Sequence, residues 1–355
     1  MGNEISLTQN SRQYTKNLVS IVTPGWNGVA FVHRLLNSIL SQTYKNIEYI
    51  YVDDGSTDGT REIILSYETK FQEAGMGFEY IFQENAGVSA ALNTALKRVR
   101  GEFLCWPEYD DFLTPDSVQK KLDYLREHPA CAVVTSDAWI INEKDLTKTT
   151  GLLSKKNPNR FERNQFIHLL LSNSIFVAGC HMARMKEFDD THPARTIFPA
   201  TIGPNWQMLL PLYYKYERGF IDEPLLYYLC RDSSISHNNQ KSIKARLSAI
   251  ASYLEILNSV LNDIPMPEDE RNKYKTMVAV RYAATRLSMA LRNSDLPLLR
   301  EQYKILKQNK ALTTKHKIIY LIANNQALSM LYKFSHMLRN TLKVLKNKFR
   351  RFSNH

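Results

Sequence analysis

The sequence predicts an α/β fold in which a doubly wound, mostly parallel sheet is followed by an all-α extension. Short β-rich runs alternate with helix-like segments up to about residue 137, an alternation that is typical of βαβ units. After residue 236 only helical periodicity remains. We therefore expect four parts: a polar segment 1–17, an α/β domain 18–236, a helical region 237–314 and a basic amphipathic tail 315–355.

The elements of the first half follow from composition and periodicity. Runs rich in β-branched, aromatic and aliphatic residues predict strands at Leu18–Thr23, Ile47–Val52, Phe78–Phe82, Phe103–Trp106 and Ala132–Ser136. Apolar residues at three- and four-residue spacing predict helices at Phe31–Gln42, Asp58–Tyr67, Ser89–Arg100 and Pro115–Glu127. Because the carboxyl ends of such strands form the ligand site of a doubly wound sheet, the residues directly after each strand are the candidate site.

The pattern is weak over residues 147–200, and we expect this stretch to recognise most of the acceptor of any reaction. Beyond it, a helix is expected over Trp206–Tyr216 and an extended segment over Pro224–Leu229. Further helices are expected over Ile243–Leu261, over Pro267–Arg292, which begins with three acids that suit a helix N-terminus, and from Asp295 onward.

The positive charge is concentrated at one end of the chain. Lys and Arg number 46 against 35 Asp and Glu, a formal net charge of +11, and residues 301–355 hold twelve of these bases and one acid. Such an excess implies an anionic partner. Bases interleaved with apolar residues over 315–355 predict a helix on an anionic membrane surface, and the alternative is a bundle helix with a solvated basic face. We expect no nucleic-acid partner, because the tail has few aromatic residues and no recognition motif.

The four cysteines are widely spaced, at Cys105, Cys131, Cys180 and Cys230. This spacing fits a reducing compartment and argues against a disulfide scaffold or a zinc module. The first seventeen residues lack the apolar run of a secretory signal, and no stretch of eighteen uninterrupted apolar residues occurs. We therefore expect a cytoplasmic protein that lies peripherally on the inner face of the plasma membrane.

Two strand ends carry residues suited to a nucleotide. Pro24 and Trp26 follow the first strand, where the indole ring could stack on a base; a buried core tryptophan is the alternative. Asp53 and Asp54 follow the second strand, where carboxylates can accept hydrogen bonds from ribose hydroxyls or a base N–H. An Asp-rich turn is the alternative for this pair.

Glu108, Asp110 and Asp111 follow the fourth strand. Three acids within four residues repel one another unless a cation neutralises them, and hard divalent cations prefer oxygen ligands. The alternative is a helix N-cap with the other acids solvated. No GxGxxG or GxxxxGK[ST] loop is present, which argues against dehydrogenases and P-loop NTPases. We therefore expect Mn²⁺ or Mg²⁺ to bind a diphosphate at this cluster.

These residues belong to a longer pattern that resembles the family 2 glycosyltransferases, which have the GT-A fold. The matching motifs keep their order and spacing over residues 18–137, at Val19–Asn27, Ser38–Tyr44, Val52–Asp58, Glu84–Asn93, Gly101–Phe103 and Asp110–Pro115. A weaker likeness extends through Gly203–Trp206 and Asp222–Leu225 to Ser236. The resemblance implies a nucleotide-sugar donor, usually a UDP-sugar, and transfer with inversion.

The resemblance also implies roles for individual residues. Donor binding is implied for Pro24, Trp26, Asp53, Asp54, Asn85, Gly87, Glu108 and Arg231. Within this set, Trp26 would stack on the base and Asp54 would contact uracil. Asp110 and Glu108 occupy the family's DxD motif, and Asp110 is the better metal ligand. The cation would offset charge on the departing diphosphate, and a carboxylate would take the proton of the acceptor.

Three departures from the family pattern concern the site. Glu108 is one methylene longer than the usual first Asp, and Arg231 stands where many members carry a His, so that it could clamp phosphate instead. Asn205 occupies the place of the usual base and cannot accept a proton as a carboxylate does. The catalytic candidates are therefore Asn205, in a positioning role, with Asp111 and Asp137; His181 and Asp222 are further substitutes for the base.

The leading hypothesis is a metal-dependent, inverting glycosyltransferase that acts on a glycan or lipid-linked acceptor in cell-envelope polysaccharide synthesis. The alternative motivated by Asn205 is a glycosyltransferase-like binding module that has lost its base. A sugar-phosphate nucleotidyltransferase is less favoured, because the loop Pro24–Ala30 contains no Arg or Lys.

Overall fold

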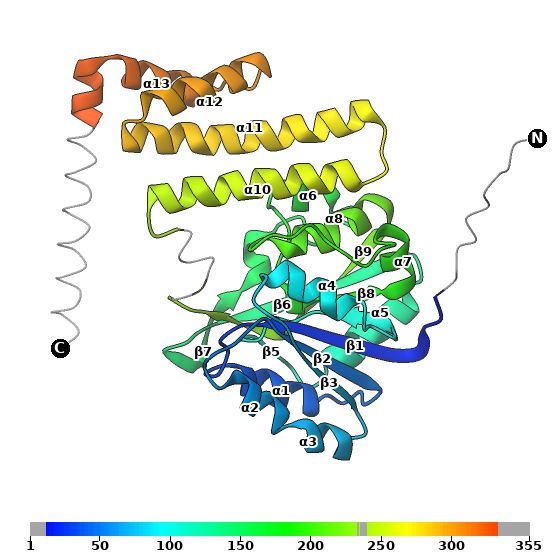
Figure 1. The fold of residues 1–355 in the computed structure, drawn as a ribbon. Coiled ribbons are helices and arrows are strands. Elements are labelled where there is room, and N and C mark those ends of the chain that lie inside the picture. The colour runs from blue at the N-terminus through cyan, green and yellow to red at the C-terminus, as the bar shows by residue number, and fades with distance from the viewer. Residues whose placement is uncertain (1–11, 233, 235–239, 333–355) are drawn as a thin grey trace, which may run out of the picture. The chain divides into compact units, whose positions relative to one another are not determined.

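The computed structural model describes residues 12–232, 234 and 240–332, and Figure 1 shows the order of the elements along the chain. The chain divides into two compact units. The first comprises Met1–His237 with Ile256–Pro265, and the second comprises Asn238–Glu255 with Met266–His355. The four-part division expected from the sequence stays a prediction.

The first unit begins with four parallel strands, which are β1 (Thr15–Gly25), β2 (Ile47–Asp53), β3 (Gly77–Phe82) and β4 (Gly101–Cys105). They pair in the order β3-β2-β1-β4. Strand β2 is buried at every residue, as expected for a parallel strand that is covered on both faces. The βαβ arrangement predicted for this half is confirmed.

Helices α1 (Val32–Leu40), α2 (Thr60–Leu65), α3 (Glu68–Glu73), α4 (Val88–Leu96) and α5 (Ser117–Glu127) follow these strands. Helices α1, α2 and α3 lie on one face of the parallel strands and α4 lies on the other (Figure 1). The helix expected to begin over 58–67 is α2, which ends at Leu65, and α3 follows as a separate short helix. Asp58 stays outside α2 because its carboxylate accepts the backbone N–H groups of Thr60 and Val29, each at 3.1 Å.

The second half of the sheet contains β5 (Phe112–Leu113), β6 (Cys131–Asn142), β7 (Asp145–Leu152), β8 (His181–Arg184) and β9 (Glu217–Cys230). In the part of the chain that the structure describes, the full order is β3-β2-β1-β4-β8-β6-β9-β5, with β7 paired to β6. Strands β6 and β9 are parallel to each other, and the other pairs of this half are antiparallel. The sequence pattern does not predict β5, β7 or β8. Strands β5 and β8 are short and pair with strands that are distant in sequence, and β7, which pairs with the preceding β6, is largely exposed.

Further helices of the first unit are α6 (Phe166–Leu170), α7 (Met185–Thr191) and α8 (Pro204–Lys215). Helix α8 confirms the helix expected over 206–216. The main apolar core lies between the sheet and the helices α1, α2, α3 and α5, and includes Leu35, Leu36 and Ile39 of α1. This core fixes α1, and therefore the loop before it, against the strand ends.

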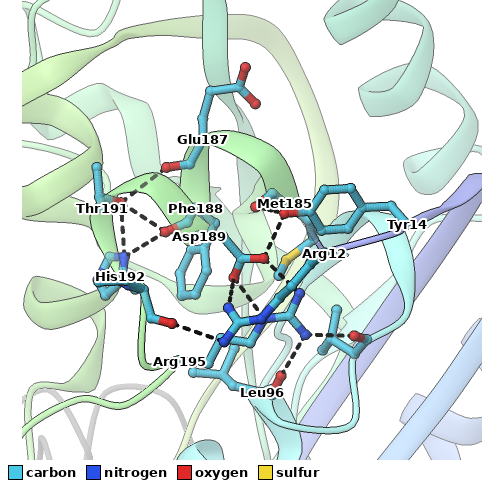
Figure 2. Close-up of polar contacts among 12 residues, drawn as sticks. Arg12, Tyr14, Leu96, Met185, Glu187, Phe188, Asp189, Thr191, His192 and Arg195 are labelled. Carbon is cyan, nitrogen blue, oxygen red and sulfur yellow. Dashed lines mark hydrogen bonds and ion pairs between the residues drawn. The ribbon is translucent and has the colours of Figure 1, made fainter. Parts of the chain in front are cut away.

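A buried polar network joins three segments of the first unit around Asp189 of α7, as Figure 2 shows. Arg195 donates to both carboxylate oxygens of Asp189, from Nε at 2.7 Å and from Nη2 at 2.8 Å, and its Nη1 donates to Leu96 O at 3.1 Å. Arg12 pairs with Asp189 at 3.1 Å, and the Tyr14 hydroxyl donates to it at 2.6 Å. The network thus ties α7 to the end of α4 and to the residues that lead into β1.

The second unit is helical, as expected. Its helices are α11 (Glu268–Asn293), α12 (Leu296–Gln308) and α13 (Thr314–Asn324), and α10 (Ile243–Asp263) contributes to both units. Leu287, Leu299, Leu306 and Ile319 form its apolar core. Among the residues described, no helix has the length and apolar character required to cross a membrane. Most of the predicted tail, residues 333–355, lies outside the described residues.

Candidate active site

The carboxyl ends of the parallel strands meet at one edge of the sheet. Pairing places Gly25 of β1 beside Asp53 of β2, and Asp53 beside Phe82 of β3. The backbone continues this row, since the N–H of Asp54 donates to Gly25 O and the N–H of Gln83 donates to Asp53 O, each at 2.9 Å. The loops that carry the candidate donor-binding residues therefore begin side by side.

The loop after β1 holds Trp26 at the surface, with 51% of the residue exposed. The loop after β2 supports it: the N–H of Asn27 donates to Ser56 Oγ at 2.9 Å, and the N–H of Gly28 donates to Thr60 Oγ1 at 2.8 Å. Asn27 has a φ of 51°, a left-handed conformation that asparagine tolerates better than most residues. The alternative of a buried core tryptophan is therefore wrong, and the indole is accessible to a planar ligand.

Three further donor-binding candidates lie around this edge. Pro24 is buried in β1 and is paired with Val52 of β2. Asn85 is exposed in the loop between β3 and α4. Gly87 precedes α4 with a φ of 90°, and a Cβ at this position would lie 3.6 Å from Thr201. Gly87 therefore supplies a turn that other residues adopt only with strain.

Asp53 and Asp54 are both buried and both accept hydrogen bonds. Asp53 accepts from the Tyr80 hydroxyl at 2.7 Å, and burial together with this bond raises the pKa of Tyr80 above its usual range. Asp54 accepts the N–H of Ala86 at 2.9 Å and the N–H of Gly87 at 2.8 Å. The Asp54 carboxylate thus holds the loop before α4 in place. Its Oδ1 also accepts the side-chain amide of Gln83 at 2.8 Å, so Oδ2, which accepts one donor, is the oxygen that can accept another.

The acidic cluster lies between β4 and β5. Glu108, Asp110 and Asp111 offer oxygens that all lie within 4.8 Å of one another. Asp111 Oδ1 accepts the N–H of Leu229 in β9 at 2.9 Å, whereas its Oδ2 is buried without a hydrogen-bond partner among the described residues. An orphaned carboxylate oxygen beside two further carboxylates is a donor set that fits a hard divalent cation.

The crowding of these acids alters their protonation. The pKa of Glu108 is raised to about 7, by loss of hydration first and then by the charge of Asp110, while Arg231 acts in the opposite direction. Burial, with repulsion from Asp110 and Glu108, raises the pKa of Asp111 well above its usual range. Glu108 nevertheless keeps solvent contact, so a cation can reach the cluster there. A bound cation would favour the charged form of each carboxyl.

Arg231, which directly follows β9, adjoins the cluster. Its guanidinium pairs with Asp110 at 2.6 Å, and the two side chains are only 13% and 8% exposed. Its Nη2 also lies 3.5 Å from the Tyr109 hydroxyl, and its guanidinium carbon lies 4.4 Å from the ring centroid of Phe31. Ion pairing and cation–π contact together fix this guanidinium beside the candidate metal ligands.

Asn205 is buried at the start of α8, and its amide is engaged at both ends. Its Oδ1 accepts the indole N–H of Trp106 at 3.1 Å, and its Nδ2 donates to Phe176 O at 2.9 Å. Trp106 follows β4 directly and stands two residues before Glu108. Asn205 therefore braces the segment that leads from β4 into the acidic cluster.

The other candidate bases have different surroundings. Asp137 is buried in β6, where its Oδ1 accepts the N–H of Ser154 at 3.0 Å. His181 is buried, and burial with the nearby charges of Arg218 and Lys121 lowers its pKa well below the usual range, so that it stays neutral. Asp222 is exposed and pairs with an arginine at 3.3 Å. Asp137 is thus the buried carboxylate among these three.

Sequence reasoning does not single out Ser56, Thr60 or Trp106, although each positions a candidate site residue. Ser56 and Thr60 support the Trp26 loop, and Trp106 joins Asn205 to the strand before Glu108. The available signals are weak, because hydroxyl residues are common in turns and a tryptophan after a strand is usually a core residue.

Comparison with known proteins relates part of the chain to a known family. The sequence profile of Glycosyl transferase family 2 matches residues 20–191. An uncharacterized glycosyltransferase of Rickettsia prowazekii (strain Madrid E) is 27% identical over 261 residues, which cover 71% of this chain and 70% of that protein. The putative teichuronic acid biosynthesis glycosyltransferase TuaG of Bacillus subtilis (strain 168) is 35% identical over 117 residues. That match covers 33% of this chain and 45% of TuaG, so the chain spans less than half the length of this relative.

A solved structure shows the same fold. TarS of S. aureus in complex with UDP-GlcNAc matches with a TM-score of 0.59 at 15% identity, over 86% of this chain and 84% of that one. The α/β sheet followed by a helical region, which the sequence predicts, is confirmed by this match and by the elements themselves. Residues 20–191 of the chain therefore belong to glycosyltransferase family 2, with the GT-A fold.

Proposed function

We propose that this chain is an inverting glycosyltransferase that transfers a sugar from a nucleotide sugar, a UDP-sugar in the first instance. The acceptor would be a hydroxyl of a glycan or lipid-linked molecule in cell-envelope polysaccharide synthesis. The observation that carries the proposal is the meeting, at one sheet edge, of the exposed Trp26, the Asp53–Asp54 pair and the acidic cluster of residues 108–111. The family membership, the name of TuaG and the UDP-GlcNAc complex of TarS support it.

Donor recognition would begin at the β1 and β2 loops. Trp26 would stack on the base, because its indole is exposed while its neighbours Asn27 and Gly28 are held by hydrogen bonds. Asp54 Oδ2 would accept a base N–H in addition to the N–H of Gly87. Asn85 and Gly87 lie in the loop that Asp54 fixes, and so they would contact the same part of the donor.

The diphosphate would lie over the acidic cluster. Asp110 and Glu108 would hold Mn²⁺ or Mg²⁺, with Asp111 beside them. When bound, the cation supplies electrostatic stabilisation of the departing diphosphate. Arg231 would bind a phosphate oxygen, because its guanidinium is already fixed against Phe31 beside Asp110.

In the transfer step the acceptor hydroxyl would attack the anomeric carbon while the bond from that carbon to the diphosphate breaks, which inverts the configuration. A carboxylate would take the hydroxyl proton. Asp111 and Asp137 are the proposed candidates for this role. Asn205 is proposed as a positioning residue, because an amide takes no proton at neutral pH and both of its ends are engaged.

The test is a transfer assay with the full chain, a panel of nucleotide sugars, Mn²⁺ and extracted lipid acceptors. We expect one donor to be consumed with formation of a glycosylated product, and Asp110→Ala to abolish this consumption while the protein stays folded. Asp116→Ala, which removes a carboxylate from the solvent-facing start of α5, is the matched control and should retain activity. Full activity in Asp110→Ala would contradict the metal assignment.

A second candidate function is favoured by one observation, the amide of Asn205 at the place of the usual base. A binding module without catalysis would bind a nucleotide sugar tightly and neither transfer nor hydrolyse it, and Asp110→Ala would leave that binding unchanged. The same assay, read together with donor binding by ligand-observed NMR, separates the two functions.

We also propose that residues 315–355 hold the protein on the anionic inner face of the plasma membrane, with the enzyme on the cytoplasmic side. Within the described part of this tail, Ile318, Leu321, Met330 and Leu331 are exposed apolar residues. Twelve bases against one acid over 301–355 would add attraction to anionic headgroups. We propose no nucleic-acid partner.

A further inference from the structure

Two arginines that are distant in sequence contact the same aromatic ring beside the candidate active site. Arg34 lies in the first turn of α1, and its guanidinium carbon is 5.4 Å from the ring centroid of Phe31. Arg231 follows β9, and its guanidinium carbon is 4.4 Å from the same centroid. Phe31 immediately precedes α1, and its ring centroid lies 6.5 Å from that of Tyr109, the residue between Glu108 and Asp110 in the sequence.

The two arginines differ in how they are neutralised. Arg231 forms an ion pair with Asp110 at 2.6 Å. Arg34 has no side-chain hydrogen bond or ion pair with any residue in the described ranges, and it is only partly exposed. Partial burial lowers the pKa of Arg34, and the charges of Asp110 and Arg231 act on it in opposite directions. Asp110 and both guanidinium groups therefore occupy one neighbourhood.

Both arginines also carry an unused donor. The Nε of Arg34 and the Nε of Arg231 are each buried without an acceptor among the described residues. A buried N–H that lacks an acceptor costs free energy, and no residue in the described ranges supplies an acceptor to either group. An anion with several oxygens would satisfy both of them.

We propose that Arg34 is a phosphate-binding residue which, with Arg231, clamps the diphosphate of the nucleotide donor and supplies affinity that does not require a divalent cation. The inference rests on the proposed function, because that function brings a diphosphate to the acidic cluster. It assigns to α1 a role in donor binding that neither the sequence motifs nor the acidic cluster indicates.

The chemistry of the guanidinium group fits this role. Its planar fork of N–H donors matches two phosphate oxygens at once, and it keeps its charge at all accessible pH values. Arg231 divides its donors between Asp110 and any bound phosphate, whereas Arg34 has no carboxylate partner among the described residues to compete with the ligand. Removal of Arg34 should therefore affect the phosphates and leave recognition of the base unchanged.

The test is isothermal titration of the full chain with UDP, UMP and uridine in excess EDTA, repeated with Mn²⁺. We expect Arg34→Gln to weaken UDP binding in EDTA about tenfold, as the loss of a charge-assisted hydrogen bond predicts. Binding of uridine should not change. Arg34→Lys should fall between the wild type and Arg34→Gln, because a lysine keeps the charge and loses the fork.

The matched control is Arg98→Gln, which removes the same charge from an exposed arginine beyond the end of α4 and should leave UDP binding unchanged. Thermal unfolding of each variant shows whether it is folded. If Arg34→Gln fails to fold, the test uses Arg34→Lys instead. For that variant we expect UDP affinity in EDTA to fall about threefold.

The inference would be overturned if a folded Arg34 variant bound UDP in EDTA as tightly as the wild type. It would also be overturned if the variant lost affinity for UDP and for uridine to the same extent. Either result would leave the proposed function standing, because the wild-type protein would still bind the nucleotide. A wild-type chain that binds none of the three ligands, with or without Mn²⁺, would overturn both.

Discussion

The three acids of the cluster are neighbours in sequence and have three different environments. Asp110 is paired with Arg231, Asp111 accepts one backbone N–H deep in the protein, and Glu108 keeps part of its surface exposed while its carboxyl group loses hydration. Residue identity alone does not distinguish these states, because each depends on what β9 and the segment after it bring to the cluster. The consequences can be measured residue by residue.

Metal affinity should depend on pH through Glu108. A carboxyl must lose its proton to bind a cation, and the pKa of Glu108 is raised to about 7. We therefore expect Mn²⁺ affinity to rise about tenfold between pH 6 and pH 8, measured by titration calorimetry. Glu108→Gln should bind Mn²⁺ more weakly and with a shallower pH dependence. Equal wild-type affinity at pH 6 and pH 8 would contradict this assignment.

The same shift has a defined sign for stability. Glu108 holds its proton more tightly in the folded protein than at its ordinary pKa of 4.5. Below pH 4.5 the Glu108 carboxyl is protonated in both the folded and the unfolded state. Its charge therefore does not lower the free energy of unfolding there. As the pH rises from 4.5 through 7, the unfolded state loses this proton more readily than the folded state, and the free energy of unfolding falls. Glu108→Gln should remove this fall in the free energy of unfolding. The measurement is denaturant unfolding of the metal-free protein across that pH range.

Asn205→Asp should destabilise the protein rather than create a base. The Nδ2 of Asn205 donates to Phe176 O at 2.9 Å, and an aspartate would place a carboxylate oxygen against that carbonyl in a buried site. We expect a loss of about 1–3 kcal/mol in the free energy of unfolding, measured by urea denaturation, and no gain in transfer rate. A faster variant of unchanged stability would instead identify position 205 as a competent base position.

At the scale of elements, long β-rich runs and amphipathic helices are predictable from the sequence, and short strands are not. Strands β1, β2 and β4 and helices α1 and α5 have a clear apolar pattern, because each buries a face along most of its length. Strand β5 has two residues and β7 is largely exposed. The partner of β5 is β9, which is distant in sequence, whereas β7 pairs with the preceding β6 and lacks an apolar pattern because its side chains are mostly exposed.

The joint between α7, α4 and the start of β1 should depend on Asp189. Asp189→Ala would leave the guanidinium of Arg195, which is only 7% exposed, without its carboxylate. Removing one partner of a buried pair costs about 3 kcal/mol, and we expect a loss of this size in the free energy of unfolding. Asp190→Ala is the control, because its pair with Lys215 is more exposed and should contribute less than about 1 kcal/mol. Equal effects of the two substitutions would refute a special role of the Asp189 network.

At the scale of the whole molecule, the net charge of +11 is the sum of two unlike parts. The residues before 301 are neutral overall, and the excess lies in the last part of the chain. Within that part, α13 belongs to a folded core through Ile319. A test of membrane binding must therefore spare α13, since cutting at residue 315 would expose that core.

Deletion of residues 333–355 should reduce binding to anionic liposomes. The deleted segment contains seven Lys and Arg and no acid, and each base near such a surface contributes about 1 kcal/mol. We expect the full chain to sediment with phosphatidylglycerol-containing vesicles at low salt and the truncated chain to remain in the supernatant. Neither should sediment with neutral vesicles. Unchanged sedimentation of the truncated chain would refute the tail as the membrane anchor.

The sequence by itself determines the fold class and predicts the place of the candidate site. Parallel strands joined by helices bring their carboxyl ends to one edge, so Trp26, Asp53 and the acidic cluster can be assigned to that edge from their positions alone. Only the tertiary structure decides how these side chains are paired. The contacts of Arg231 with Asp110 and Phe31 and of Asn205 with Trp106 depend on strand register and helix packing. These interactions join distant parts of the chain or orient a side chain in three dimensions, which local sequence patterns do not encode.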